Sequence, residues 1–204
     1  MTNTTYATPT PTFSLTRTAF VAGPVALGAY GVIRLLSERG TPSAGWTAGH
    51  LAMLVGVLLF VPVMLHLRGL APEGRRVPAV VALAVGLVGL FATAVQAVVD
   101  LAAGLLADDR AGMVEIFQRV KEVPGVEPVV YGVVPPLFFL GVIGLAALTA
   151  LPVRTRAFMA GALALGTVLM ALDLNFLALG GLCFLLALAP LARGGRVAPL
   201  PRTN

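Results

Sequence analysis

Long apolar runs, separated by short polar connections, fill the chain from about residue 19 to residue 192. Most of the runs are long enough for a helix that crosses a hydrocarbon core of about 30 Å at 1.5 Å per residue. The predicted spans lie at about 19–37, 45–67, 77–105, 129–151, 156–172 and 176–192. The pattern therefore predicts an all-α fold, a polytopic transmembrane bundle of six helices.

The ends of the chain differ from this six-helix transmembrane domain of residues 19–192. Residues 1–18 carry eight threonines and two prolines, which predicts a disordered polar N-terminal tail, and residues 193–204 form a basic C-terminal tail. The last two apolar runs are short, and Asp173 to Asn175 predicts a tight hairpin between them. A merged re-entrant pair is the alternative for these two runs.

The third connection is the one long loop, and it has a helical period of its own. Met113, Ile116, Phe117 and Val120 recur on one face, with charged and amide side chains on the other. This predicts an amphipathic helix over about residues 108–122, stopped by a proline. Two interpretations stay open: an interfacial helix that lies on the bilayer, or a lid over a cavity in the bundle.

Composition supports the membrane interpretation. Hydrophobic residues make up 58% of the chain and charged residues 11%, whereas a soluble domain is roughly a quarter charged. This excludes a soluble enzyme and a nucleic-acid-binding protein. With six spans, nine basic residues share the side of both termini and five lie on the other side. The positive-inside rule then predicts a multi-pass protein with both termini cytoplasmic. The near-exclusion of lysine is typical of a GC-rich bacterial genome, which predicts the inner membrane.

Small and polar residues form one stripe along the third run. The stripe consists of Ala82, Gly86, Gly89, Thr93, Gln96, Asp100 and Gly104. Such a stripe is expected to face protein and to pack closely against other helices. Asp100 is exceptional, because an ionised carboxylate in hydrocarbon must be paired, protonated or in contact with water. It marks either a site or the headgroup level at the end of a long span.

Counting residues from the ends of the predicted spans places further polar residues at the same membrane depth as Asp100. The predicted catalytic residues are Asp100, Gln96, His50, Tyr131 and Asp173. The predicted substrate-binding residues are Trp46, Phe91, Thr93, Phe138 and Phe139. Each also has a plainer interpretation: Trp46 and Tyr131 as interfacial anchors, His50 as a packed imidazole, and Asp173 as a turn residue.

Several chemistries lack the residues that they need. His50 and His66 are the only histidines, lie about 24 Å apart on one helix and cannot ligate one haem iron. One cysteine with two distant histidines gives no zinc site, so we expect no metal and no cofactor. Pro135 and Pro136 inside the fourth run predict a kink, because they remove two backbone donors.

The remaining groups suit acid–base chemistry or binding in an apolar pocket. A desolvated Asp100 can donate a proton to an alkene or epoxide, and aromatic faces can shelter a carbocation. In size and helix number the chain resembles the small integral-membrane terpene cyclases of bacterial and fungal pathways, which implies no site residues here. The alternatives are a small-molecule binding or transport subunit, and a structural membrane protein. Expected partners are membrane lipid, a lipophilic small molecule, no nucleic acid, and either a second copy or a partner subunit.

Overall fold

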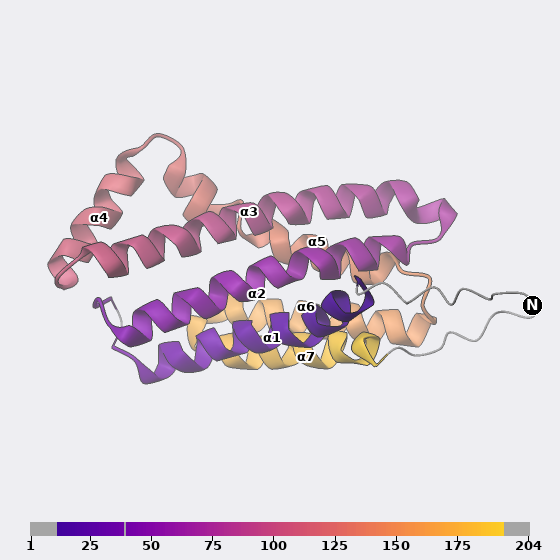
Figure 1. Cartoon of the computed structure of the whole chain (residues 1–204). Coiled ribbons are helices and arrows are strands. Elements are labelled where there is room, and N and C mark those ends of the chain that lie inside the picture. The colour runs from indigo at the N-terminus through magenta and orange to yellow at the C-terminus, as the bar shows by residue number, and fades with distance from the viewer. Residues whose placement is uncertain (1–11, 39, 194–204) are drawn as a thin grey trace, which may run out of the picture.

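The computed structural model describes residues 12–38 and 40–193, and these form an all-α bundle (Figure 1). Its long helices are α1 (Thr12–Leu36), α2 (Ala44–Gly69), α3 (Arg76–Leu106), α4 (Arg110–Glu122), α5 (Pro136–Leu148), α6 (Val153–Leu172) and α7 (Leu177–Ala192). Short helical turns are η1 (Glu73–Arg75), η2 (Glu127–Gly132) and η3 (Leu174–Phe176). The all-α class predicted from the apolar runs is confirmed.

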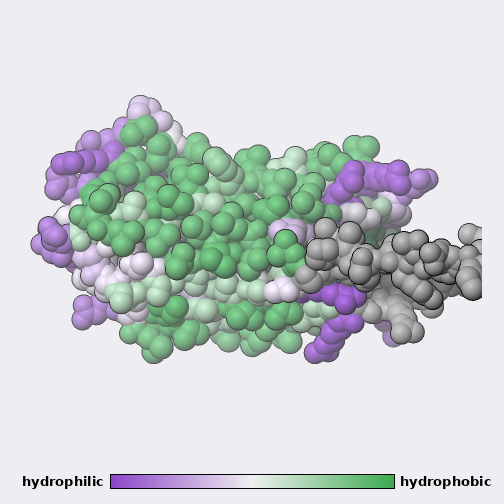
Figure 2. Space-filling view, in the orientation of Figure 1, coloured by the Kyte–Doolittle hydropathy of each residue, from purple (hydrophilic) through white to green (hydrophobic). Residues whose placement is uncertain are grey.

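The bundle is that of a multi-pass membrane protein. Five helices within the described residues are long and apolar enough to span a membrane, α6 and α7 among them. Helix α1 begins and α7 ends at the same end of the bundle, here called the terminal end (Figure 1). The opposite end, here called the α4 end, holds the α1–α2 turn, α4 and η3. Figure 2 shows an apolar surface between polar side chains at the two ends.

Helix α1 begins earlier than predicted. It starts at Thr12, so residues 12–18, which the sequence places in the polar tail, are helical. Once a helix is nucleated, each added turn forms its backbone bonds at little cost, and the apolar run after residue 18 supplies the nucleus. Residues 1–11 of that tail lie outside the described residues. The basic C-terminal tail does too, apart from Arg193.

The predicted fourth span of 129–151 is two pieces. Its first part is the π-helix η2, in which the Val133 N–H donates to the Pro128 carbonyl over 2.8 Å. Helix α5 then starts at Pro136 and has 13 residues, too few to cross the membrane alone. Pro135 and Pro136 cause the break, because neither has the N–H that would continue the α-helix.

The spanning helices and α5 form a closed ring. Going round it, α1, α2, α3, α5, α6 and α7 each pack against the next, and α7 packs back on α1. The centre is filled by the fully buried rings of Phe60, Phe138 and Phe184. Phe60 and Phe138 meet edge to face, with ring centroids 5.2 Å apart. The middle of the bundle is therefore a packed core.

The small-residue stripe of α3 lies inside the bundle. Its members Gly86, Gly89, Thr93 and Asp100 are buried. Gly86 and Gly141 of α5 meet backbone to backbone, since a Cβ at Gly141 would stand 2.3 Å from the Gly86 Cα. A Cβ at Gly89 would meet the Phe138 backbone at 2.0 Å. Glycine is thus required at these crossings.

Helix α4 realises the predicted amphipathic helix of 108–122. Asp109 caps it, accepting a 2.8 Å hydrogen bond from the Gly112 N–H. Met113 on its apolar face is 1% exposed, and the Phe117 ring contacts that of Trp46 with centroids 6.3 Å apart. The helix therefore rests on the bundle through its apolar face, at the end where α2 begins.

Candidate functional site

A capped turn at the start of α2 places Trp46 and His50. The Ser43 hydroxyl accepts a 3.1 Å hydrogen bond from the Trp46 N–H, so the α-helix starts at Ala44. Four residues apart, Trp46 and His50 are neighbours on the helix surface, and their ring centroids lie 4.2 Å apart. The His50 Nδ1 lies 2.8 Å from the Trp46 carbonyl oxygen, which can only accept. This contact makes Nδ1–H the donor.

The other ring nitrogen of His50 faces Asp100 on α3. The distance from His50 Nε2 to Asp100 Oδ2 is 3.5 Å, and the two residues are only 4% and 7% exposed. With Nδ1–H on the Trp46 carbonyl, the Nε2–Oδ2 contact is attractive when one of the two groups holds a proton there. A proton between Nε2 and Oδ2 would therefore join the two helices, in a place that water barely reaches.

Trp46 joins the same two helices by a second bond. Its Nε1–H donates to the Asp100 backbone carbonyl over 2.7 Å. Gly104, one turn further along α3, makes room for the indole, because a Cβ there would stand 2.4 Å from Trp46 Cδ1. Trp46, His50 and Asp100 thus form a polar contact between α2 and α3, here called the α2–α3 contact.

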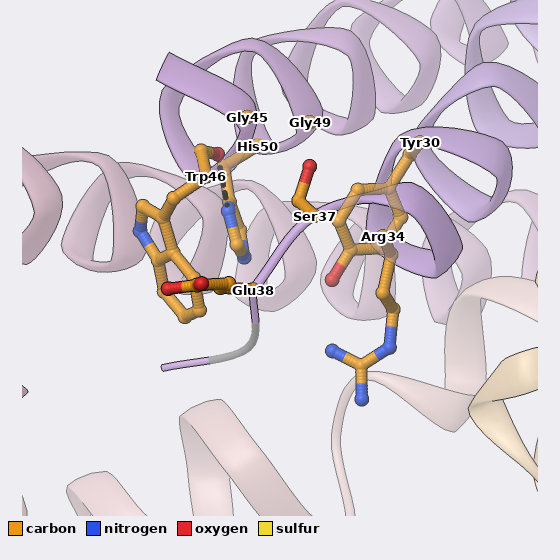
Figure 3. Close-up of a pocket in the computed structure, with 8 residues that line it drawn as sticks. All are labelled: Tyr30, Arg34, Ser37, Glu38, Gly45, Trp46, Gly49 and His50. Carbon is orange, nitrogen blue, oxygen red and sulfur yellow. Dashed lines mark hydrogen bonds between the residues drawn. The ribbon is translucent and has the colours of Figure 1, made fainter. Parts of the chain in front are cut away.

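A pocket opens beside this contact, at the α4 end (Figure 3). The pocket is a shallow opening with an enclosed volume of only about 20 Å³; the space around it, open solvent included, is about 280 Å³. The residues that line it come from α1, the following turn and α2: Tyr30, Arg34, Ser37, Glu38, Gly45, Trp46, Gly49 and His50. Asp100 does not line it, because His50 stands between Asp100 and the pocket.

Tyr30 and Arg34 are lining residues that the sequence interpretation missed. They lie four residues apart near the end of α1, and the Tyr30 hydroxyl lies beside the Arg34 guanidinium (Figure 3). The Tyr30 ring also meets the His50 ring edge-on, with centroids 5.2 Å apart. The available signal was Arg34 itself, an arginine within the last turns of the predicted span of 19–37.

Gln96 and Tyr131 lie near the α2–α3 contact without joining it. Gln96 is half-buried and makes no side-chain hydrogen bond to a described residue. Tyr131 lies close enough to Asp100 for the two groups to interact electrostatically. Its hydroxyl oxygen is buried and has no hydrogen-bond partner among the described residues. Catalytic roles for both stay predictions.

Asp173 is at the same end of the bundle, where it caps a turn of its own segment. It precedes η3, where its Oδ1 accepts a 2.8 Å hydrogen bond from the Asn175 N–H. Its side chain is exposed at the α6–α7 hairpin. The geometry of Asp173 is that of a turn cap, the plainer of the two interpretations.

The predicted aromatic and hydroxyl residues of the site are dispersed. Phe91 is 70% exposed on the outer face of α3, so it points away from the pocket. Phe138 belongs to the central core and Phe139 packs against it, with the two rings tilted and their centroids 4.9 Å apart. The Thr93 hydroxyl donates to the Gly89 carbonyl of its own helix over 2.9 Å. None of these four lines the pocket, whereas Trp46 does.

Neither metal ligation nor similarity defines the site further. Among the described residues, no three His, Cys, Asp or Glu side chains come together as metal ligands. Comparison of the chain with protein-family models, curated proteins and solved structures finds no match. The features of the chain that bear on function are therefore the pocket and the α2–α3 contact.

Proposed function

We propose that this membrane protein binds a small amphiphilic molecule in the pocket between α1 and α2. The observation that carries the proposal is the composition of the lining. Aromatic rings of Tyr30 and Trp46 stand beside the charged side chains of Arg34 and Glu38 and the hydroxyl of Ser37. Rings offer apolar contact and the polar groups fix orientation, as in typical small-molecule sites.

The depth of the pocket suits a ligand with an apolar tail and a polar head. Asp100 lies about 36 Å along α3 from Arg76, at 1.5 Å per residue, against a hydrocarbon core of about 30 Å. With Arg76 at the headgroups of the terminal end, the pocket beside Asp100 lies at the headgroups of the α4 end. An amphiphile in the adjoining leaflet has its head at this level.

Binding is favoured over proton donation because the buried acid, Asp100, does not line the pocket, and the acid that does, Glu38, is exposed. The Nδ1 of His50 is bonded to the Trp46 carbonyl, Nε2 faces Asp100, and Asp100 itself lies behind the imidazole. In this arrangement the α2–α3 contact holds the pocket wall in place. Its role is positioning.

A membrane-embedded acid–base enzyme that acts on a lipophilic substrate, such as an isoprenoid cyclase, is the second candidate. The observation that favours it is the buried carboxyl–imidazole pair of Asp100 and His50. A proton held there reaches the pocket when the His50 ring turns its Nε2 outward. Conversion of a lipophilic substrate by wild type, and its loss in Asp100→Asn, would favour this candidate.

The binding proposal is tested by filling the pocket. Ser37→Phe adds a ring on a lining residue, whereas Leu36→Phe adds one at the neighbouring side chain, which is 83% exposed. We expect wild type and Leu36→Phe to co-purify with the same enriched lipid species, and Ser37→Phe to lose it. The measurement is mass spectrometry of lipids extracted from the purified proteins. Identical lipid profiles for the two variants would contradict the proposal.

A further inference from the structure

We infer that Arg34 makes the pocket a site for an anionic group, a phosphate or carboxylate, such as the head of an acidic amphiphile. This inference rests on the proposed binding function and names the chemistry of its ligand. It starts from one atom: the Arg34 Nε is buried and has no hydrogen-bond partner among the described residues.

An unpartnered guanidinium donor inside a protein is costly. A guanidinium has five donors and no acceptor, so the Arg34 Nε can be satisfied only by an acceptor such as an anion oxygen. Nε and one Nη form a planar fork that matches two oxygens of a carboxylate or phosphate. A ligand with such a group would satisfy the orphaned Nε and the charge together.

No acid of the described residues already fills this role. The ion pairs among them join other residues, and Arg34 is in none. Glu38 lines the same pocket, but its exposed carboxylate and the Arg34 guanidinium point apart (Figure 3). The nearest buried carboxyl, that of Asp100, is engaged by His50 behind the pocket wall.

Neighbouring groups complete a binding position for an anion. The Tyr30 hydroxyl lies beside the guanidinium, and the Ser37 hydroxyl lines the pocket three residues further on. The Tyr30 hydroxyl can donate to an oxygen that the Arg34 fork leaves free, whereas the Ser37 hydroxyl points toward α2 (Figure 3). The Trp46 and His50 rings form the opposite wall, where the first methylenes of an acyl or alkyl chain would pack.

Trp46 supplies the readout, because it lines the pocket and is the one tryptophan of the chain. The full-length protein in phosphatidylcholine nanodiscs is titrated separately with dodecyl phosphate, dodecanol and inorganic phosphate. The fluorescence emission of Trp46 is recorded during each titration. We expect saturable changes with dodecyl phosphate at concentrations at least tenfold lower than with dodecanol, roughly the effect of one charged hydrogen bond.

Two substitutions separate the guanidinium from a general surface charge. Arg34→Gln is expected to weaken dodecyl phosphate binding about tenfold or more. Arg34→Lys keeps the charge but loses the fork, so its affinity for dodecyl phosphate should lie between those of wild type and Arg34→Gln. Arg110→Gln is the matched control, since Arg110 is exposed at the same end of the bundle and lines no part of the pocket. It should bind like wild type. Circular dichroism checks folding, and Arg34→Lys carries the test if the glutamine variant does not fold.

The outcomes distinguish the source of the anion and the two proposals. An Arg34-dependent response to inorganic phosphate alone identifies a free anion as the ligand, and a response only to dodecyl phosphate identifies a lipid head; both support the inference. Equal binding of dodecanol and dodecyl phosphate, unchanged in Arg34→Lys, overturns the anion site and leaves amphiphile binding standing. No response to any probe overturns both.

Discussion

Helix α3 makes two contacts of opposite character along its length. Near the middle of the bundle, Gly86 and Gly89 bring its backbone directly against α5. At the α4 end, Asp100 meets α2 through the large side chains of Trp46 and His50, over distances of 2.7 and 3.5 Å. The first contact is made by glycines, which have no side chain, and the second by large side chains that pair with polar groups of the other helix.

The comparison shows how a helix bundle can be tight in one place and open in another. Glycine crossings bury no side-chain polar group and leave no space, so they seal the core. Large paired side chains hold the helices further apart, and such pairs stabilise only while every polar atom has a partner. The pocket lies beside the second contact, and Trp46 and His50 belong to both.

Adding one methyl group at the glycine crossing should cause the largest loss of stability. Gly141→Ala places a Cβ 2.3 Å from the Gly86 Cα, and backbone cannot move aside as a flexible side chain can. We expect about 3 kcal/mol of destabilisation, the upper range for overpacking. Thermal unfolding in detergent, followed by circular dichroism, measures it.

The control for this substitution is Gly161→Ala on α6, where a Cβ meets nothing within 4 Å. It should unfold no more easily than wild type, because alanine favours the helix. Equal stability of the two variants would mean that the crossing tolerates a side chain, and the contrast between the two contacts would be lost.

Removing the carboxyl of the α2–α3 contact should have an intermediate effect. Asp100→Ala leaves His50 Nε2 buried without its partner, which costs about 1–3 kcal/mol. The Trp46 bond goes to the Asp100 backbone carbonyl and should survive. Asp100→Asn restores a group that can hydrogen-bond with Nε2 and should recover most of the loss in thermal unfolding. No recovery would show that the negative charge matters more than the hydrogen bond.

The smallest effect should come from the contact between α4 and the bundle. Phe117→Ala removes the ring beside Trp46, and we expect about 1 kcal/mol or less of global stability to be lost. The local effect should be clearer, as faster amide hydrogen exchange in Arg110–Glu122. Val114→Ala on the exposed face of the same helix is the control and should leave exchange unchanged. Faster exchange in both variants would mean that helix propensity, not docking, orders α4.

Features that depend on residues near one another in sequence were predictable. The periodicity of Met113, Ile116 and Phe117 indicated α4, and the Pro135–Pro136 pair indicated the break before α5. Counting residues from the ends of two spans was enough to set His50 and Asp100 at one level. Depth is nearly fixed by sequence position once a helix spans a bilayer.

Rotation about each helix axis was not predictable in the same way. Which face of α1 meets α2 depends on side-chain packing, so Tyr30 and Arg34 were not recognised as pocket residues. The same uncertainty put Phe91, which faces outward, into the predicted site. Helices α1 and α3 carry apolar residues all round. Because the lipid outside and the protein inside are equally apolar, hydrophobicity does not distinguish the face that meets lipid from the face that meets protein.

The unequal lengths of neighbouring helices give the pocket a dependence on its bilayer. Helix α3 is about 46 Å long and α5, packed against it, about 20 Å. No single hydrocarbon thickness matches both, and tilt or local thinning must absorb the difference. In a thicker membrane acyl chains would cover Arg34 and Trp46, and in a thinner one both would stand among headgroups and water. Bilayer thickness would then control how easily the polar head of the proposed ligand enters the pocket.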